Sequence, residues 1–373
     1  MNTHRDAVLH RQTRLAEALD EYGIDALVVN AGPTLTYLTG LHFHLSERPV
    51  VGVFRSDGAP HLVLPSLEMG KIRKVGFEVA TFDYGEDPGT WQGVFNKAFS
   101  DAGVRRGRLG IEPGSLRVLE LRHIEEAAAE AELRNAQSCI ASLRVIKDAA
   151  EIAAMREAVH MAETAVEATL DRVKPGMTEK EIAAELVLQL IRSGSSAELP
   201  FEPIVATGPN SADPHAVPSG RRLAHREVLL IDWGANNGGY FSDLTRVFSF
   251  GEPAEEAVGI AEVTAEANAA GRAAARPGAT AGSIDRAARE VIEKRGYGKY
   301  FLHRTGHGLG IEVHEEPYIR SDNEQVLEPG MTFTIEPGIY LANNVGVRIE
   351  DDMLITESGA ESLSTIDRGL VIL

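Results

Sequence analysis

A single cysteine, Cys139, occurs among the 373 residues, so the sequence excludes an intrachain disulfide framework and a metal site built from thiolates. No stretch approaches the roughly 18 uncharged apolar residues that a membrane-spanning helix needs. The first residues, MNTHRDAVLHRQTR, lack the apolar core of a signal peptide. We therefore expect a cytoplasmic protein without a membrane partner.

Basic residues are scarce relative to acidic ones. The chain has 37 Lys and Arg against 55 Asp and Glu, which gives a formal net charge of -18. A nucleic-acid partner requires a face rich in Lys and Arg, so this balance argues against one. An acidic chain is compatible with a protein that gathers cations, although a solvated acidic surface is the commoner cause.

The length of the chain predicts two domains. Residues 1–135 alternate helical patterns with short apolar runs, and Asp57-Gly58 marks a turn between two strands in VVGVFRSDGAPHLVL. This pattern is typical of a small α/β domain, and no motif in it carries recognisable chemistry. We expect a linker at residues 136–147 and a second domain at residues 148–373.

The second domain contains an internal repeat. KPGMT at residues 174–178 is echoed by RPGAT at residues 276–280, and in the same register Gly194 corresponds to Gly296. Each copy has the pattern of two helices followed by a strand hairpin. We therefore expect an α+β fold built by duplication.

The hairpin of the first copy, VLLIDWGANNGGYFSDLTRVF, carries two carboxylates on apolar strands. Asn237-Gly238 is its strongest turn signal, and counting outward from this turn places Asp232 opposite Asp243. The two acids would share one face with Cβ atoms roughly 5 Å apart, which is destabilising unless a cation or a shared proton neutralises them.

The hairpin of the second copy, MTFTIEPGIYLANNVGVRIEDDMLIT, repeats the arrangement. A turn centred on Asn343 places Glu336 opposite Glu350. Any one of these acids would more often be a solvated surface group, but four at matching positions favour a metal site. Oxygen ligands suit hard or borderline cations such as Mn²⁺, and a carboxylate can bridge two ions.

Histidines complete the set of candidates. The Gly-rich segment HRTGHGLGIEVHEEP carries His303, His307 and His314, any of which could supply a nitrogen ligand. His215 lies between prolines in the polar loop PNSADPHAVPSG. Such a residue is normally a surface group, so the sequence leaves its role open.

Four segments closely resemble the signature blocks of the pita-bread metallopeptidases, the group of methionine aminopeptidase, aminopeptidase P and prolidase. These segments are IDWGANNGGYFSDLTRVF, GHGLGIEVHEEP, TIEPGIY and GVRIEDD. The resemblance spans roughly residues 148–373. The first domain, with YLTG at residues 37–40, and the joining LRVIKDAAEIAAMREA resemble the creatinase, prolidase and aminopeptidase P branch. The resemblance implies a creatinase-like N-terminal domain followed by a duplicated pita-bread catalytic domain.

The metal-binding pattern of this family falls on five residues of the sequence: Asp232, Asp243, His307, Glu336 and Glu350. The resemblance implies two divalent metal ions, with Mn²⁺ expected and Co²⁺ or Zn²⁺ as alternatives, bridged by Asp243 and Glu350. Creatinases lack this set. Trp233 departs from the smaller residue that usually follows the first Asp, but adjacent strand residues face opposite ways, so ligation should not be disturbed.

The resemblance also implies catalytic roles. Glu336 is expected to shuttle a proton, and His215 and His314 are expected to hydrogen-bond the substrate or the tetrahedral intermediate. Arg348 should share a face with Glu350, two residues along a strand, and could orient that carboxylate or the substrate. A plain salt bridge with a neighbouring acid is the alternative for Arg348.

This branch of the family implies hydrolysis of the peptide bond before proline, in dipeptides or short peptides, by a homodimer. The compact chain favours an Xaa-Pro dipeptidase (prolidase) over an Xaa-Pro aminopeptidase (aminopeptidase P), which takes longer peptides. The loop at residues 42–48 is the expected barrier to a third residue. The alternative from another class is an inactive pita-bread module that binds peptides or proteins, and the intact ligand set argues against it.

Overall fold

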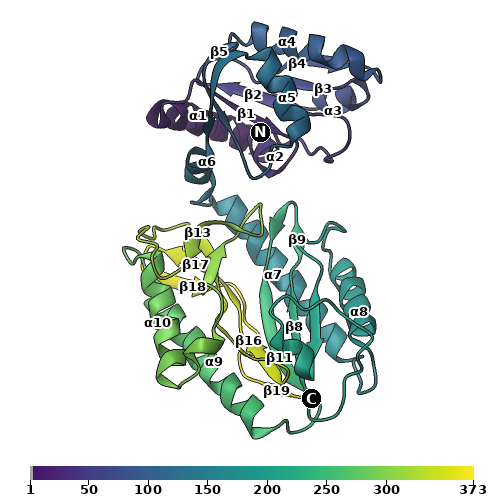
Figure 1. The fold of residues 1–373 in the computed structure, drawn as a ribbon, viewed down its shortest axis with the longest axis vertical. Helices are drawn as coiled ribbons and strands as arrows, with labels where there is room; N and C mark the ends of the chain where they lie inside the picture. Colours follow the sequence, from purple (N-terminus) through teal and green to yellow (C-terminus); the bar gives the residue numbers. More distant parts are fainter. Residues whose placement is uncertain (1–2) are drawn as a thin grey trace. The chain divides into compact units, whose positions relative to one another are not determined.

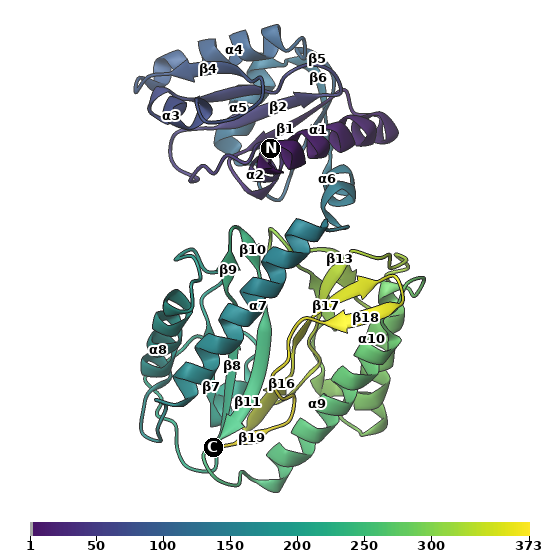
Figure 2. The same cartoon turned by 180° about the vertical axis from the view of Figure 1, so that it is seen from behind.

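The computed structural model of the chain describes residues 3–373 and divides into two compact units, Met1–Arg144 and Val145–Leu373 (Figures 1 and 2). The stretch at residues 136–147, expected as a linker, contains helix α6 (Gln137–Arg144). No helix among the described residues is both long enough and apolar enough to span a membrane.

The first unit is a six-stranded mixed sheet in the order β4-β3-β2-β1-β5-β6 with helices packed against it. Its central strand β1 is wholly buried, and β2 pairs antiparallel with β3 around the predicted Asp57-Gly58 turn. The strands are β1 (Ala26–Asn30), β2 (Val51–Arg55), β3 (His61–Pro65), β4 (Ala80–Tyr84), β5 (Arg106–Ile111) and β6 (Glu130–Asn135). The helices are α1 (Thr3–Tyr22), α2 (Pro33–Thr39), α3 (Met69–Ile72), α4 (Trp91–Asp101), α5 (Val118–Ala127) and α6. The small α/β domain predicted from the sequence is therefore present.

The second unit places two pairs of helices outside its strands. The first pair is α7 (Ala149–Leu170) with α8 (Glu179–Arg192), and the second is α9 (Glu255–Ala274) with α10 (Ala281–Lys294). Asp148 and Thr178 begin α7 and α8, each through a capping box in which the Glu three residues later bonds back to the cap. The helix starts are thus fixed by local side chains.

The strands of this unit form two larger sheets and two small hairpins. The sheet orders are β19-β11-β8-β7 and β13-β12-β14-β17-β18, and the hairpins are β9-β10 and β15-β16. The strands of the first repeat are β7 (Ile204–Thr207), β8 (Val228–Trp233), β9 (Asn236–Asn237), β10 (Tyr240–Phe241) and β11 (Leu244–Ser249). Those that follow are β12 (Gly306–Gly308), β13 (Glu315–Ile319), β14 (Thr332–Ile335), β15 (Gly338–Leu341), β16 (Val345–Arg348), β17 (Asp351–Thr356), β18 (Gly359–Ser362) and β19 (Val371–Ile372).

Backbone hydrogen bonds reveal the duplication directly. The N–H of Gly176 donates to Leu223 O, and the N–H of Gly278 donates in the same way to Leu327 O. Two isolated β-bridges also correspond between the repeats, Thr178–Arg222 in the first and Thr280–Val326 in the second. The predicted duplicated α+β unit is confirmed.

The register of the first acidic hairpin differs from the prediction. Asp232 stands opposite Thr245, not opposite Asp243, because the turn lies one residue later, at Gly238-Gly239. Both glycines have positive φ, 61° and 91°, as a two-residue turn of type I′ requires. A shift of the turn by one residue moves the register by two, so Asp232 and Asp243 still share a face as diagonal neighbours.

The second acidic hairpin has the predicted register. Asn343 adopts a left-handed conformation with φ 60° at the centre of the turn. The ladders on both sides agree, with Gly338 opposite Arg348 and Ile335 opposite Asp351. Glu336 and Glu350 lie between these two ladders and therefore oppose each other.

Candidate metal centre and active site

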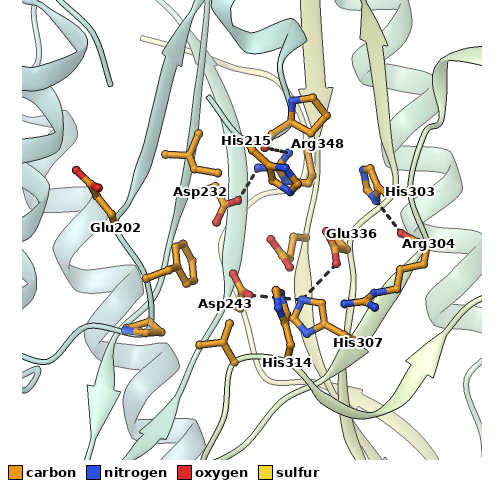
Figure 3. Close-up of a pocket in the computed structure, with 16 residues that line it drawn as sticks. Glu202, His215, Asp232, Asp243, His303, Arg304, His307, His314, Glu336 and Arg348 are labelled. Carbon is orange, nitrogen blue, oxygen red and sulfur yellow. Dashed lines mark hydrogen bonds and ion pairs between the residues drawn. The ribbon is translucent and has the colours of Figure 1, made fainter. Parts of the chain in front are cut away.

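A pocket of about 790 Å³ in the second unit brings together all nine residues singled out from the sequence (Figure 3). They are His215, Asp232, Asp243, His303, His307, His314, Glu336, Arg348 and Glu350. In the first repeat, Asp232 lies on β8 and Asp243 directly precedes β11. In the second repeat, His307 lies on β12, Glu336 directly follows β14 and Glu350 directly precedes β17. Trp233 faces the other way and is fully buried in the apolar core, as the strand alternation predicts.

The centre of the pocket is a compact group of ligand-type atoms. One ligand atom each from Asp243, His307 and Glu350 lies within 4.8 Å of the other two. His307 Nε2 is 3.4 Å from Glu336 Oε1 and 3.7 Å from Asp243 Oδ2. The imidazole therefore points its Nε2 at the carboxylates, while its Nδ1 lies 3.1 Å from Gly308 O.

The glycines beside His307 let its strand approach its neighbours closely. A Cβ on Gly306 would lie 1.9 Å from Thr334 O, and one on Gly308 would lie 2.2 Å from Glu316 O. His307 N donates to Thr334 Oγ1 at 3.2 Å. Only glycine fits on either side of this histidine, because any side chain would push the backbones apart.

Burial perturbs every titratable group in the cluster. Burial, and then the neighbouring carboxylates, raise the pKa of Asp243 and of Glu350 well above the usual range. Burial raises the pKa of Glu336 to about 7, although Arg348 opposes the shift. Burial lowers the pKa of His307 well below its usual value, so that this ring is neutral.

Two buried oxygen atoms in the cluster have no hydrogen-bond partner within the described part of the chain, Asp232 Oδ1 and Glu350 Oε1. An unpaired buried carboxylate oxygen is costly, and four acids around one space need positive charge. Oxygen ligands from several carboxylates together with one imidazole nitrogen suit divalent cations of intermediate hardness. The residues present therefore fit a site for divalent metal ions.

Arg348 forms an ion pair with Asp232 and not with Glu350. Its Nη2 lies 2.5 Å from Asp232 Oδ2, and its Nε donates to Thr245 Oγ1 at 3.1 Å. Thr245 Oγ1 in turn donates to Glu350 Oε2 at 2.6 Å. Arg348 thus holds one oxygen of Asp232 directly and reaches Glu350 only through Thr245.

Three residues that support this arrangement were not predicted from the sequence. Thr245 could have been found, because it follows Asp243 by two residues on a strand and shares its face. Tyr340 accepts from Arg348 Nη1 at 2.8 Å and lies 2.9 Å from His303 Nε2. Asp352 Oδ2 accepts from the backbone N–H of Asp243 at 3.1 Å, a long-range contact without a local sequence signal.

Two of the other histidines, His215 and His314, lie at the exposed side of the pocket. The His314 ring stands perpendicular to the His307 ring with centroids 4.1 Å apart. Burial and then the nearby Arg304 lower the pKa of His314. His215 lines the same pocket close to Asp232 and Arg348 (Figure 3).

Two family models cover most of the sequence. Metallopeptidase family M24 matches residues 153–357, and the creatinase/prolidase N-terminal domain matches residues 11–146. The chain belongs to metallopeptidase family M24. The predictions of a pita-bread metallopeptidase, of a creatinase-type N-terminal domain and of a metal-dependent enzyme are confirmed.

Relatives within the family are similar over nearly their whole length. The chain is 34% identical to an Xaa-Pro dipeptidase of Lactobacillus helveticus, over 96% of this chain and 98% of the relative. The structure matches a crystal structure described as a dipeptidase from Pyrococcus horikoshii with a TM-score of 0.91 and 38% identity, covering 97% and 100% of the two chains. It also matches an X-Pro aminopeptidase from Thermotoga maritima with a TM-score of 0.85 and 30% identity, covering 97% and 99%. Family M24 relatives of both activities thus share this architecture.

We expect divalent metal binding to release protons between about pH 5 and about pH 7. The raised pKa values of Asp243, Glu350 and Glu336 mean that the metal-free cluster retains protons there, whereas a ligating carboxylate is ionised. His307 is already neutral and contributes none. Affinity for Mn²⁺ should therefore increase as the pH rises toward about 7.

Titration calorimetry of chelator-treated protein with Mn²⁺, in two buffers of different ionisation enthalpy, measures this release. Glu336→Gln should release fewer protons, while the exposed Glu357→Gln should behave as wild type. Heats at pH 6 that do not depend on the buffer would contradict the prediction.

Proposed function

We propose that the protein is an Xaa-Pro dipeptidase that hydrolyses the peptide bond before proline with two divalent metal ions, Mn²⁺ in the first instance. The observation that carries the dipeptidase assignment is Arg304, a cation that lines the pocket and forms no ion pair with any residue that the structure describes. Relatives described as dipeptidases or prolidases, at 33–38% identity over more than nine-tenths of the chain, support the same assignment.

Arg304 differs from the other arginine of the pocket. Arg348 forms an ion pair with Asp232. The Arg304 guanidinium instead lies 4.4 Å from the centre of the Tyr318 ring and forms no ion pair with any described residue. An Xaa-Pro dipeptide carries its carboxylate on the residue directly after the scissile bond. A longer peptide has a neutral amide there, so an available guanidinium favours the dipeptide.

The five proposed ligands would hold two ions that polarise the scissile carbonyl and lower the pKa of a water molecule. Glu336 lines the pocket beside His307 and is suited to accept a proton from that water and return it to the proline nitrogen. His215 and His314 are placed at the exposed side of the pocket to donate hydrogen bonds to the substrate. Arg348 fixes Asp232 Oδ2 and leaves Oδ1 for ligation.

Aminopeptidase P activity on longer peptides is the alternative. The loop at residues 42–48 remains the predicted barrier to a third residue, and homodimerisation remains a prediction. Phe201 and Val313 line the apolar part of the pocket and are suited to the side chain before proline or to the proline ring.

The Mn²⁺-loaded protein should cleave Xaa-Pro and leave Xaa-Pro-Yaa intact. Arg304→Met should lower kcat/KM for Xaa-Pro about 10- to 100-fold, because a charge-assisted hydrogen bond is lost, and Arg304→Lys should retain part of the activity. Neither variant should change hydrolysis of an Xaa-Pro amide, which lacks the carboxylate. Chromatographic detection of free proline or prolinamide provides the rates, and cleavage of Xaa-Pro-Yaa but not Xaa-Pro would overturn the dipeptidase assignment.

A further inference from the structure

Residues 207–219, here called the His215 segment, carry His215 to the pocket. The segment begins at Thr207, passes through the short helix η3 (Gly208–Ala212) and ends at Ser219. His215 is exposed, and its ring has no hydrogen bond to any residue in the described part of the chain. The position of the ring therefore depends on how the backbone of the segment is held.

Glu179, the first residue of α8, bonds both ends of the His215 segment although its side chain is fully buried. Its Oε1 accepts from Thr207 N at 2.8 Å and Thr207 Oγ1 at 2.9 Å. Its Oε2 accepts from Ser219 N at 3.0 Å and Ser219 Oγ at 2.6 Å. Asn210 Nδ2, inside the segment, lies 3.0 and 3.1 Å from the two oxygens. One carboxylate thus holds the start, the middle and the end of the segment.

Strand β16 holds the other side of the segment. Gly346 N donates to Ser211 Oγ at 2.8 Å, and Arg348 Nη1 donates to Pro214 O at 3.3 Å. A Cβ on Gly346 would lie 2.0 Å from Ser211 O, so the two backbones are in close contact. The residue before His215 is therefore bonded to the same arginine that fixes Asp232.

The second repeat contains a related contact, although its acid bonds only one end of a segment and also pairs with Arg289. Asp285 on α10 is fully buried, and its Oδ1 accepts from Thr305 N at 3.0 Å and Thr305 Oγ1 at 2.8 Å. Thr305 directly precedes the strand that carries His307, as Thr207 begins the segment that carries His215. Ala281 matches Glu179 in the duplication, and Asp285 lies one turn further along the same helix face. In both repeats, a buried carboxylate therefore accepts hydrogen bonds from a threonine that precedes a histidine of the pocket in the sequence.

We propose that Glu179 is a positioning residue that sets the place of the His215 ring in the pocket. This inference rests on the proposed role of His215 in binding substrate. The Glu179 carboxylate bonds the start, the middle and the end of the one segment that carries His215, so a change at Glu179 acts on the ring through that segment. Glu179 itself does not line the pocket and acts through the His215 segment.

Glu179→Gln tests the proposal, because it preserves shape but turns one acceptor oxygen into an NH₂ group that faces N–H donors. We expect kcat/KM for Xaa-Pro to fall about 10- to 100-fold, as is common for residues that orient a site from behind. Glu179→Gln should change the same kinetic constant, kcat or KM, that His215→Ala changes. In the His215→Ala background, Glu179→Gln should have less than about a twofold further effect, since the group it positions is absent.

Glu163→Gln is the matched control. Glu163 is also buried and bonds a backbone segment outside the pocket, accepting from Thr365 N, Thr365 Oγ1 and Ile366 N. It should leave kcat/KM unchanged. Hydrogen exchange followed by mass spectrometry should show faster exchange of residues 207–219 in Glu179→Gln but not in Glu163→Gln, with bound Mn²⁺ equal in both.

The outcomes separate this inference from the proposed function. If the wild type cleaves no Xaa-Pro substrate, or His215→Ala is fully active, the proposed function or the role of His215 fails. Suppose that His215→Ala is impaired but Glu179→Gln lowers kcat/KM by the same factor in the His215→Ala background as in the wild type. In that case, or if hydrogen exchange of residues 207–219 is unchanged in Glu179→Gln, only the positioning role is refuted. Should Glu179→Gln not fold, Ser219→Ala removes the 2.6 Å bond to Glu179 together with the bonds that Ser219 Oγ accepts from Asn210 Nδ2 and Arg221 N. Its smaller loss must likewise vanish in the His215→Ala background.

Discussion

Asp243→Asn is expected to lower kcat/KM by about 10³-fold or more, the largest effect on activity of any substitution considered. Losses of 10- to 100-fold are usual when only a group behind a metal ligand is removed, and loss of a proposed ligand itself should cost more. Asp243 is 5% exposed and lies within 4.8 Å of the ligand atoms of His307 and Glu350. Steady-state rates with Mn²⁺, together with metal content by mass spectrometry, measure both consequences.

The same substitution should stabilise the metal-free protein. Burial and neighbouring acids raise the pKa of Asp243 well above its usual value, so ionisation near neutral pH works against folding, and a neutral amide removes that cost. Metal-free Asp243→Asn should therefore unfold at a higher temperature than the metal-free wild type at pH 8. Asp322 has a side chain that is 72% exposed, so Asp322→Asn should change neither kcat/KM nor the unfolding temperature of the metal-free protein. Full activity in Asp243→Asn would show that the metal site is wrongly assigned.

Asp351→Ala should produce the largest loss of stability. Asp351 is fully buried and accepts hydrogen bonds from Arg246 Nη2 at 2.7 Å, Arg368 Nε at 2.7 Å, Asn268 Nδ2 at 3.0 Å and Ser364 Oγ at 2.5 Å. Its removal leaves the 1% exposed Arg246 without a carboxylate. Breaking a buried pair from one side costs about 3–5 kcal/mol, which corresponds to roughly 6–20 °C in the unfolding temperature of a unit of this size.

Calorimetry or circular dichroism can follow the unfolding of the second unit in this variant. Glu361→Ala is the control, because it breaks an ion pair with Arg156 in which both side chains are 43% exposed. Such a surface pair contributes about 0–1 kcal/mol, so its transition should move little. Equal shifts of the unfolding temperature in the two variants would contradict the expectation that breaking the buried ion pair costs more stability than breaking the exposed one.

The sequence predicts a hairpin well when a single residue type determines its turn. Asn343 tolerates the left-handed conformation, and the turn centred on it places Glu336 opposite Glu350. In the first hairpin, Asn237-Gly238 and Gly238-Gly239 are both good turn sequences, and the chain uses the second. The predicted pairing of Asp232 with Asp243 was therefore wrong, yet both acids reach the site because the alternation of side chains survives a shift of two residues.

Contacts between distant segments could not be predicted in this way. Arg348 was expected to orient Glu350 or the substrate, or else to form a plain salt bridge with a neighbouring acid. The structure shows a salt bridge, and its partner is Asp232 of the other repeat, which sequence distance does not identify. Glu179 carries no local signal of its role, since its contacts lie 28 to 40 residues further along the chain. Tertiary packing decides such partners, and a single sequence contains no record of it.

The division of the proposed ligands between the repeats has a consequence for how the protein is made. Asp232 and Asp243 lie in the first repeat, whereas His307, Glu336 and Glu350 lie in the second. A nascent chain on the ribosome therefore lacks a complete site until synthesis has passed Glu350 and the two repeats have packed together. Partial translation products and proteolytic fragments that contain one repeat should be inert toward peptides, so that cleavage is confined to fully folded molecules.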